Sequence, residues 1–423
     1  MSRDLTSLVS QLDLDEKAAL VAGADLWSTV AVERLGIPSV RVTDGPNGAR
    51  GPMLPGAGGE SSTTSCVPCG AALGATWNSE LIERVGVLVG EEARTKTCRV
   101  LLAPTVNLHR SPLGGRNFES YSEDPLLAGR IGAAFIRGAQ SAGVACTVKH
   151  FAGNESENDR MVADSIIGAR ALRENHLLPF EIAITEGGAL GIMTAYNRLN
   201  GEYCANSRWL LEDVLRGEWG FDGFVISDWF AFAQTEDAVT AGLDLEMPGP
   251  GRAYGPSLAE AVRDGRVDVS LVDAAVLRLL TAFDRVGAFD DDPTVRPGSE
   301  DRPGHRAVAR EAAVDATVLL TNRGVLPLDP QALAQLKDSA LAMDVYMWLA
   351  HRLWRIREPG GVFVPWRQLY EQFGQEYRES RDFKNSFRLA LRRVMALYAA
   401  ARIESVYGGW QLYPSAPPIP TAS

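Results

Sequence analysis

Five short apolar runs, each ending in polar residues, constrain the fold of this chain more than any other feature. Helical stretches separate the runs, and this alternation is typical of βα units around a parallel sheet. A charged side chain inside a buried parallel strand would lose its hydration, so such strands are apolar along their length. Polar residues at the strand ends therefore indicate the active face of an α/β fold, a (β/α)8 TIM-type barrel. A doubly wound open sheet is the alternative. The runs VRVTD, VLLAPTVN, ACTVKH, GIMTAYN and FVISD end at Asp44, at Asn107, at Lys149 and His150, at Tyr196 and Asn197, and at Asp228.

The chain has room for one large domain and a smaller one, because its 423 residues are 46% hydrophobic and 22% charged. After RGVLPLDP the sequence changes to segments rich in Arg and aromatic residues, with helical periodicity. We therefore expect the barrel over residues 1–330, a linker over 331–337 and a second domain over 338–423 that ends in a Pro-rich tail.

Charge and hydropathy limit the partners that we expect. The net charge of −11 disfavours nucleic-acid binding by the whole chain, although residues from Ala332 onward carry 12 Lys and Arg against 8 Asp and Glu. The N-terminus lacks the apolar core of a secretory signal, and no apolar run reaches the length of a membrane span, so we expect no membrane partner and a cytoplasmic location. The odd count of five cysteines fits reduced thiols, and Cys66 and Cys69 lack the second pair that a zinc site would need.

Asp228 ends a strongly β-prone run and is followed at once by Trp229. A glycosidase nucleophile needs an ionised carboxylate held against the anomeric carbon, and a flat apolar surface beside it binds the face of the sugar ring. The pair fits both needs. Alone it is a weak signal, since many barrels end a strand in Asp.

Further polar groups gather in two segments, KHFAGN (149–154) and GGRNFESYSEDP (114–125). Lys149 and His150 can donate to vicinal hydroxyls, as can Arg160 and Arg116. We interpret Glu119 and Asp124 as structural partners for Arg. The glycines do not follow phosphate-loop spacing, which argues against nucleotide binding, and we expect neither a metal nor an organic cofactor.

TDGPNGAR, GRNFESYSEDP, KHFAGN, MTAYN and SDW, in this order and spacing, resemble glycoside hydrolase family 3, in particular its β-glucosidase branch. The resemblance covers about residues 4–330. It implies a β-glucoside or oligosaccharide substrate, hydrolysed at its terminal non-reducing β-glucosyl residue by retaining double displacement. It also implies Asp228 as nucleophile and Met193 and Trp229 as lining of the sugar subsite. The sugar-binding positions implied are Asp44, Arg116, Lys149, His150, Arg160 and Tyr196.

In that branch the acid/base glutamate comes from a following α/β sandwich domain, which this chain does not resemble. The other solution of the family, a His–Asp pair after the KH motif, is not matched by NESENDR. Glu155 or Asp159 could substitute. General-acid assistance is worth roughly 10²–10⁴-fold, so we expect impaired hydrolysis. Barrel surface left uncovered would favour a homo-oligomer.

From about residue 338 to 420 the sequence is similar to the C-terminal part of plasmid Rep-type replication initiators, which are built of winged-helix domains. DVYMWLAHRL, VPWRQLYEQFG, FKNSFRLALRRV and LYPSAPPIP carry this similarity. It implies a small winged-helix-like α+β segment. The alternative is a solvated basic helix packed through its apolar residues. Candidates for weak DNA contact are Lys384, Arg388, Arg392 and Arg393.

Three functional hypotheses follow. The first is a β-glucosidase-type enzyme with weakened acid/base catalysis. The second is a DNA-binding replication-initiator fragment that carries the barrel as a passenger, within a fusion protein. The third is a sugar-binding pseudo-enzyme. Retention of Asp228, Lys149, His150 and Arg160 together favours the first and third over the second.

Overall fold

A computed structural model describes residues 3–51, 63–231, 233–292, 294–295, 297–317, 328–374, 377 and 379–419. By its internal contacts the chain divides into two compact units, residues 1–318 and 319–423. In the described ranges no helix is long and apolar enough to cross a membrane.

The first unit is built on a parallel sheet of five strands in the order β1-β2-β3-β5-β8. Each strand corresponds to one of the five apolar runs, which confirms the prediction of an α/β fold with parallel strands. The strands are short and almost wholly buried, as expected for a sheet covered on both faces. They are β1 (Val42–Asp44), β2 (Val100–Leu102), β3 (Ala145–Phe151), β5 (Gly191–Thr194) and β8 (Phe224–Ile226).

Single-residue bridges extend the hydrogen bonding beyond the two edge strands. Ile226 at the end of β8 bridges Leu245 in parallel, and the next residue, Glu246, bridges Ala22. Antiparallel bridges then join Gly23 to Thr29 and Ser28 to Arg41, the residue directly before β1. The bridged segments therefore lead from one edge of the five-stranded sheet back to the other.

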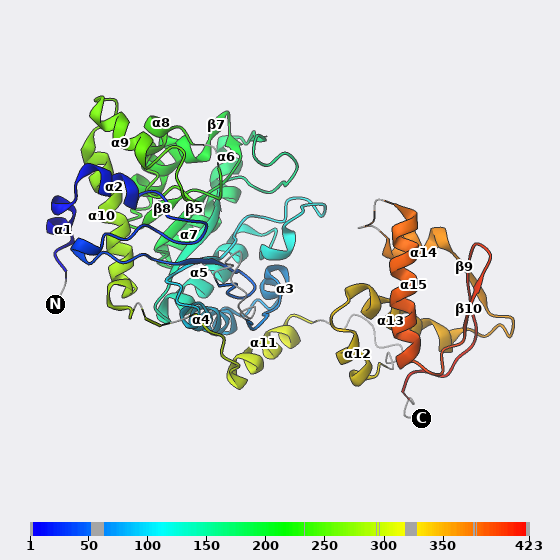
Figure 1. Cartoon of the computed structure of the whole chain (residues 1–423). Coiled ribbons are helices and arrows are strands. Elements are labelled where there is room, and N and C mark those ends of the chain that lie inside the picture. Colours follow the sequence, from blue (N-terminus) through cyan, green and yellow to red (C-terminus); the bar gives the residue numbers. More distant parts are fainter. Residues whose placement is uncertain are drawn as a thin grey trace. The chain divides into compact units, whose positions relative to one another are not determined.

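Helices pack around this sheet (Figure 1). Glycines allow the close approach of α4 (Ser79–Thr95) and α5 (Pro125–Ser141), since a Cβ at Gly138 would lie 1.9 Å from the carbonyl oxygen of Glu83. Asp124 caps α5 by accepting from Leu127 N at 2.8 Å, so our assignment of Asp124 to an Arg partner was wrong. The other helices include α1 (Leu5–Gln11), α2 (Leu14–Leu20), α3 (Gly70–Ala75), α7 (Leu178–Thr185), α8 (Thr235–Ala241), α9 (Pro256–Arg263), α10 (Val269–Arg285), α11 (Pro303–Asp315) and the π-helices η3 (Leu172–Leu177) and η5 (Trp209–Glu218).

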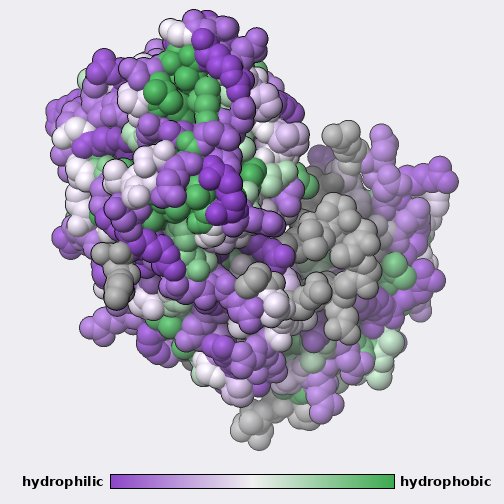
Figure 2. All heavy atoms as spheres, turned by 60° about the vertical axis from the view of Figure 1, so that its left-hand side comes forward, coloured by the Kyte–Doolittle hydropathy of each residue, from purple (hydrophilic) through white to green (hydrophobic). Residues whose placement is uncertain are grey.

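Apolar side chains of the first unit form one buried core that runs from Val9 to Ala312. The face of the molecule seen in Figure 2 is mostly hydrophilic, with small hydrophobic patches. Charged residues therefore gather outside the core, and the few buried ones need a specific partner.

The second unit has the element order helix, helix, strand, helix, helix, strand, strand, and a separate core. Its three strands form an antiparallel sheet in the order β10-β11-β9. The apolar face of α15 is buried through Phe383, Phe387, Leu391 and Val394, which confirms the predicted packing of this helix. The elements are α12 (Pro330–Leu336), α13 (Ala340–Arg352), β9 (Val362–Pro365), α14 (Trp366–Phe373), α15 (Ser380–Leu397), β10 (Ile403–Val406) and β11 (Gly409–Leu412).

Candidate active site

The polar residues predicted from the apolar runs lie at the carboxyl ends of the parallel strands. Asp44 is the last residue of β1, Lys149 and His150 lie in the last part of β3, and Asp228 follows β8 by two residues. Because these strands are parallel neighbours, their carboxyl ends meet at one edge of the sheet. That edge is where we place the candidate site.

Lys149 and Asp44 form an ion pair across two strands, with Lys149 Nζ 2.7 Å from Asp44 Oδ1. The Lys149 side chain is 4% exposed and that of Asp44 21%, so water competes weakly for the pair. Burial by itself would raise the pKa of Asp44, but the charge of Lys149, then those of Arg50 and Arg116, holds it below its usual value. Asp44 is therefore an ionised acceptor, of the kind that can receive two hydroxyl groups of a sugar.

His150 Nε2 lies 3.6 Å from Asp228 Oδ2. The other carboxylate oxygen of Asp228 accepts the backbone N–H of Trp229 at 2.7 Å. Burial, the largest effect, raises the pKa of Asp228, while Lys149, the Trp229 amide and Tyr196 oppose the rise. Burial also lowers the pKa of His150 far below its ordinary value, assisted by Arg116, Lys149 and Arg160.

Two arginines complete the cationic side of the site. Arg116 pairs with Glu119, the predicted structural partner, and lies 4.0 Å from Glu157. Arg160 pairs with Glu157 at 2.7 Å, and its guanidinium stacks 4.7 Å from the ring centroid of Tyr196. Glu157 thus joins the two arginines that the sequence placed in separate motifs.

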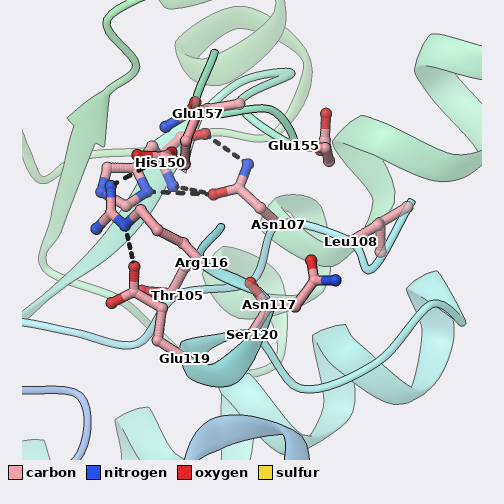
Figure 3. A pocket seen from close by; sticks show the side chains of 11 residues that line it. Thr105, Asn107, Leu108, Arg116, Asn117, Glu119, Ser120, His150, Glu155 and Glu157 are labelled. Atoms are coloured by element: carbon pink, nitrogen blue, oxygen red, sulfur yellow. Dashed lines mark hydrogen bonds and ion pairs between the residues drawn. The ribbon is translucent and has the colours of Figure 1, made fainter. Parts of the chain in front are cut away.

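Asn107 fixes His150 from both sides. Its Oδ1 accepts the backbone N–H of His150 at 2.7 Å, and its Nδ2 donates to the His150 carbonyl at 3.0 Å. Figure 3 shows the Asn107 side chain directed at His150, and Arg116 with its partner Glu119. Sequence reasoning noted Asn107 as a strand end but missed this role, because nothing in the sequence pairs it with His150.

The two predicted lining residues lie in different environments. The indole Nε1 of Trp229 donates to the Leu26 carbonyl at 3.0 Å, and its ring lies 5.2 Å from that of Trp27. Met193 is buried in β5, with 2% exposure. Trp27, which no sequence motif indicated, is the residue that holds the indole of Trp229 in place.

Glu155 and Asp159, the two candidate proton donors, lie in different surroundings. Glu155 has a side chain that is 3% exposed and lies 3.2 Å from His176 Nδ1, and Figure 3 shows it pointing away from His150 and Arg116. Asp159 is exposed and has a φ of 48°. Among the described residues no group of three or more His, Cys, Asp and Glu could hold a metal ion.

A family model described as the glycosyl hydrolase family 3 N terminal domain matches residues 17–282. This chain belongs to glycosyl hydrolase family 3. The match includes every predicted sugar-site residue from Asp44 to Trp229, and it ends well before α15.

A β-glucosidase of Rhizobium radiobacter is 49% identical over 332 residues, which cover 78% of this chain and 40% of the relative. Probable β-glucosidase I of Neosartorya fischeri is 44% identical over 326 residues, 77% of this chain and 38% of the relative. This chain therefore spans 38–40% of the length of these two relatives.

Solved structures agree with this assignment. The β-glucosidase of Kluyveromyces marxianus in complex with glucose matches with a TM-score of 0.73 and 40% identity, over 77% of this chain and 40% of that chain. β-Glucosidase 3B of Thermotoga neapolitana in complex with glucose matches with a TM-score of 0.74 and 33% identity, over 95% and 58%.

Proposed function

We propose that the first unit binds the terminal glucosyl residue of a β-glucoside and that Asp228 is the nucleophile of a retaining hydrolysis. The observation that carries this proposal is the buried Asp228 carboxylate, 3.6 Å from a neutral His150 and near the Asp44–Lys149 pair. Family membership and the glucose complexes of similar β-glucosidases support the choice of sugar.

The electrostatics of the site suit this role. His150 stays neutral because of its lowered pKa, so it does not neutralise Asp228 by forming an ion pair. Lys149 and Arg116 supply positive charge that opposes the rise in the pKa of Asp228 caused by its burial. Asp228 keeps few hydrogen bonds, since its carboxylate accepts from the Trp229 amide and Tyr196 is the other donor that lowers its pKa, and a carboxylate with few hydrogen bonds is a stronger nucleophile.

In the first step Asp228 would attack the anomeric carbon while Asp44, Lys149 and His150 hold the sugar hydroxyls. Hydrogen bonds to these hydroxyls that strengthen as charge develops on the ring would lower the barrier. The leaving-group oxygen must receive a proton or depart as an anion. Since Glu155 lies against His176 and Asp159 is exposed, neither is assigned as the proton donor, and we propose that this chain favours good leaving groups such as nitrophenolates.

We also propose that the sheet closes into the predicted barrel through the bridges at Leu245, Glu246, Ala22 and Thr29. The bridges from Ile226 to Leu245 and from Ser28 to Arg41 support it, because together they join both edges of the sheet. This closure would fix Asp44 and Asp228, which lie on the two edge strands.

A 2,4-dinitrophenyl 2-deoxy-2-fluoro-β-glucoside tests the main proposal, because it traps a glycosyl-enzyme. Mass spectrometry of the intact protein should show one added fluoroglucosyl group, and peptide mapping should place it on Asp228. The Asp228→Ala variant is the control and should gain no mass. A folded protein that releases no dinitrophenolate burst would rule out the catalytic proposal and leave sugar binding alone.

DNA contact by the second unit is a separate candidate, favoured by one observation. The order of helices and strands, with the β10–β11 hairpin following α15, supports a winged-helix-like segment. Arg392 is exposed, whereas Arg393 pairs with Asp338, and Lys384 and Arg388 stack on Trp366.

Fluorescence anisotropy with a labelled duplex at several salt concentrations tests this candidate. Real phosphate contacts would give a salt slope that falls by about 1 for each of Arg388→Gln and Arg392→Gln. Absence of binding at low salt would leave α15 as a solvated basic helix.

A further inference from the structure

Phe230 has an unusual conformation two residues after the proposed nucleophile. Its φ is 63°, in the left-handed region that a bulky residue seldom adopts, and its side chain is 47% exposed. The turn is closed by Ala231 N donating to the carbonyl of Asp228 at 3.0 Å. Such strain, held beside a site, is a reason to look for function there.

Arg252 covers part of this ring. Its guanidinium carbon lies 5.0 Å from the centroid of the Phe230 ring. Arg252 is exposed, its contact is with the Phe230 ring, and it forms no ion pair with a carboxylate of the described residues. The described arginines of the first unit's surface mostly have such partners, so Arg252 combines a flat aromatic neighbour with guanidinium N–H groups that remain available to a ligand.

Both residues are anchored to the same strand end. The backbone N–H of Phe230 donates to the Met247 carbonyl at 3.2 Å. The carboxylate of Glu246, which is 6% exposed, accepts the backbone N–H of Arg252 at 2.9 Å and that of Tyr254 at 2.7 Å. The relative position of ring and guanidinium is therefore fixed by buried backbone contacts before any ligand arrives.

The position suits the leaving group. Asp228, Lys149 and His150 are buried and hold the sugar that is attacked. In an in-line displacement the leaving group lies on the opposite side of the anomeric carbon from the Asp228 carboxylate, and from there it must extend toward solvent. Trp229 is turned toward Leu26 and Trp27, and Phe230 is the next, exposed aromatic side chain.

We propose that Phe230 and Arg252 form a leaving-group subsite that selects aryl β-glucosides whose aglycone carries a carboxylate. The aryl ring lies against the open surface of Phe230, and the carboxylate accepts from the Arg252 guanidinium. This subsite rests on the proposed function, since it needs a sugar bound at Asp228. It also agrees with the preference for acidic phenols as leaving groups.

Two chromogenic substrates test the subsite, 4-nitrophenyl β-glucoside and 3-carboxy-4-nitrophenyl β-glucoside. For each protein we divide kcat/KM for the carboxylated substrate by kcat/KM for the neutral substrate. We then compare this ratio between variant and wild type, because the difference in leaving-group acidity is the same for both proteins and cancels. Arg252→Gln should lower the ratio about two- to fivefold, the range of an exposed ion pair. Arg252→Lys should keep part of the preference because it keeps the charge.

Phe230→Leu retains an apolar side chain but lacks the aromatic face, and should raise KM for both aryl substrates about threefold with little change in kcat. Arg173→Gln is the control. Arg173 lies on η3, and its guanidinium carbon is 5.3 Å from the ring centroid of Trp209, so it also contacts an aromatic ring. This substitution should leave the ratio unchanged.

Turnover of both substrates with an unchanged ratio in Arg252→Gln overturns the subsite and leaves the proposed function intact. An equal loss on both substrates also overturns it, because the residue would then be merely structural. Failure of the wild-type protein to hydrolyse either substrate overturns the proposed function and, with it, this inference.

Discussion

His150 Nε2 and Asp228 Oδ2 lie 3.6 Å apart, a distance at which an imidazolium would form an ion pair with the carboxylate. Burial and three nearby cations instead keep His150 neutral through a lowered pKa. His150 therefore does not neutralise the charge of the proposed nucleophile. This relationship decides the expected pH dependence of the site.

We expect the acid limb of kcat/KM for 4-nitrophenyl β-glucoside to lie above the ordinary pKa range of aspartate. Burial raises the pKa of Asp228, so protonation removes the nucleophile at a higher pH than for an exposed carboxyl. A pH profile of kcat/KM between pH 3 and 8 measures this. An acid limb at or below about pH 3.9, the reference value for Asp, would contradict the raised pKa.

Asp228→Asn should stabilise the folded protein near neutral pH. The pKa of this carboxyl is higher in the folded state than in the unfolded state, so the folded state binds the proton more tightly. This tighter binding stabilises the protein fully below the unfolded pKa. The stabilisation is lost as the pH rises through the folded pKa. Removing the charge should add about 1 kcal/mol to the free energy of unfolding at pH 7. Urea unfolding measures it, with Asp222→Asn as the exposed control within about 0.5 kcal/mol of wild type. Equal stability of Asp228→Asn and wild type would argue against a raised pKa.

The ion pair between Lys149 and Asp44 should show strong coupling. Lys149→Met leaves the Asp44 carboxylate with Arg50, 3.4 Å away, as its remaining ion pair and should lower the free energy of unfolding by about 1.5–3 kcal/mol. Adding Asp44→Asn should recover most of that stability. Glucose binding, followed by calorimetry, should stay lost in the double variant, because both proposed sugar ligands are gone. Additive destabilisation by the two substitutions would contradict the coupling.

Glu92 on α4 should matter for stability although it lies in no sugar motif. It is 3% exposed, accepts Ser65 N at 2.9 Å, and lies 3.8 Å from Lys96 and 3.3 Å from His305 of α11. Glu92→Leu should cost about 3 kcal/mol, because Lys96 would remain buried without a partner.

The pKa of Glu92 is lowered, since hydrogen bonds from Ser65 and Thr64 outweigh the opposing effect of burial. The ionised Glu92 carboxylate therefore stabilises the folded protein above its unfolded pKa, and this stabilisation is lost as the pH falls through its folded pKa. The midpoint temperature of thermal unfolding should thus change less between pH 7 and pH 4 in Glu92→Leu than in wild type. Glu311→Gln, at an exposed pair with Arg84, is the control.

Phe387→Ala should destabilise the second unit alone. Phe387 is 1% exposed and lies 5.7 Å from the Trp366 ring and 5.6 Å from Phe383. Removing the ring should cost about 3–5 kcal/mol in that unit. Near-ultraviolet circular dichroism should then show an earlier transition for the second unit and an unchanged one for the first. A shift of both transitions would mean that the units unfold together.

The strands and the site edge could be predicted because their signal is local. A run such as FVISD carries both its β propensity and the polar residue at its end, so Asp228 and Asp44 were placed correctly on the sheet. The π-helical turns at Leu172–Leu177 and Trp209–Glu218 were not predictable in this way, because their sequences have ordinary helical periodicity.

Contacts between segments far apart in the sequence could not be predicted either. Trp27 reaches Trp229 across some 200 residues, and Glu157 joins Arg116 to Arg160. Trp229 and Arg116 lie in recognisable motifs, but nothing in the chain near them names Trp27 or Glu157 as their partners. Only the folded backbone brings such side chains within contact distance. The contact between Phe230 and Arg252 is of the same kind, and no sequence motif predicted it.

The two cores share no residue in the described part of the chain, since one ends at Ala312 and the other begins at Ala332. A substitution in the interior of one unit therefore removes no packing contact from the buried core of the other. Each interior can change by mutation without a matching change in the other.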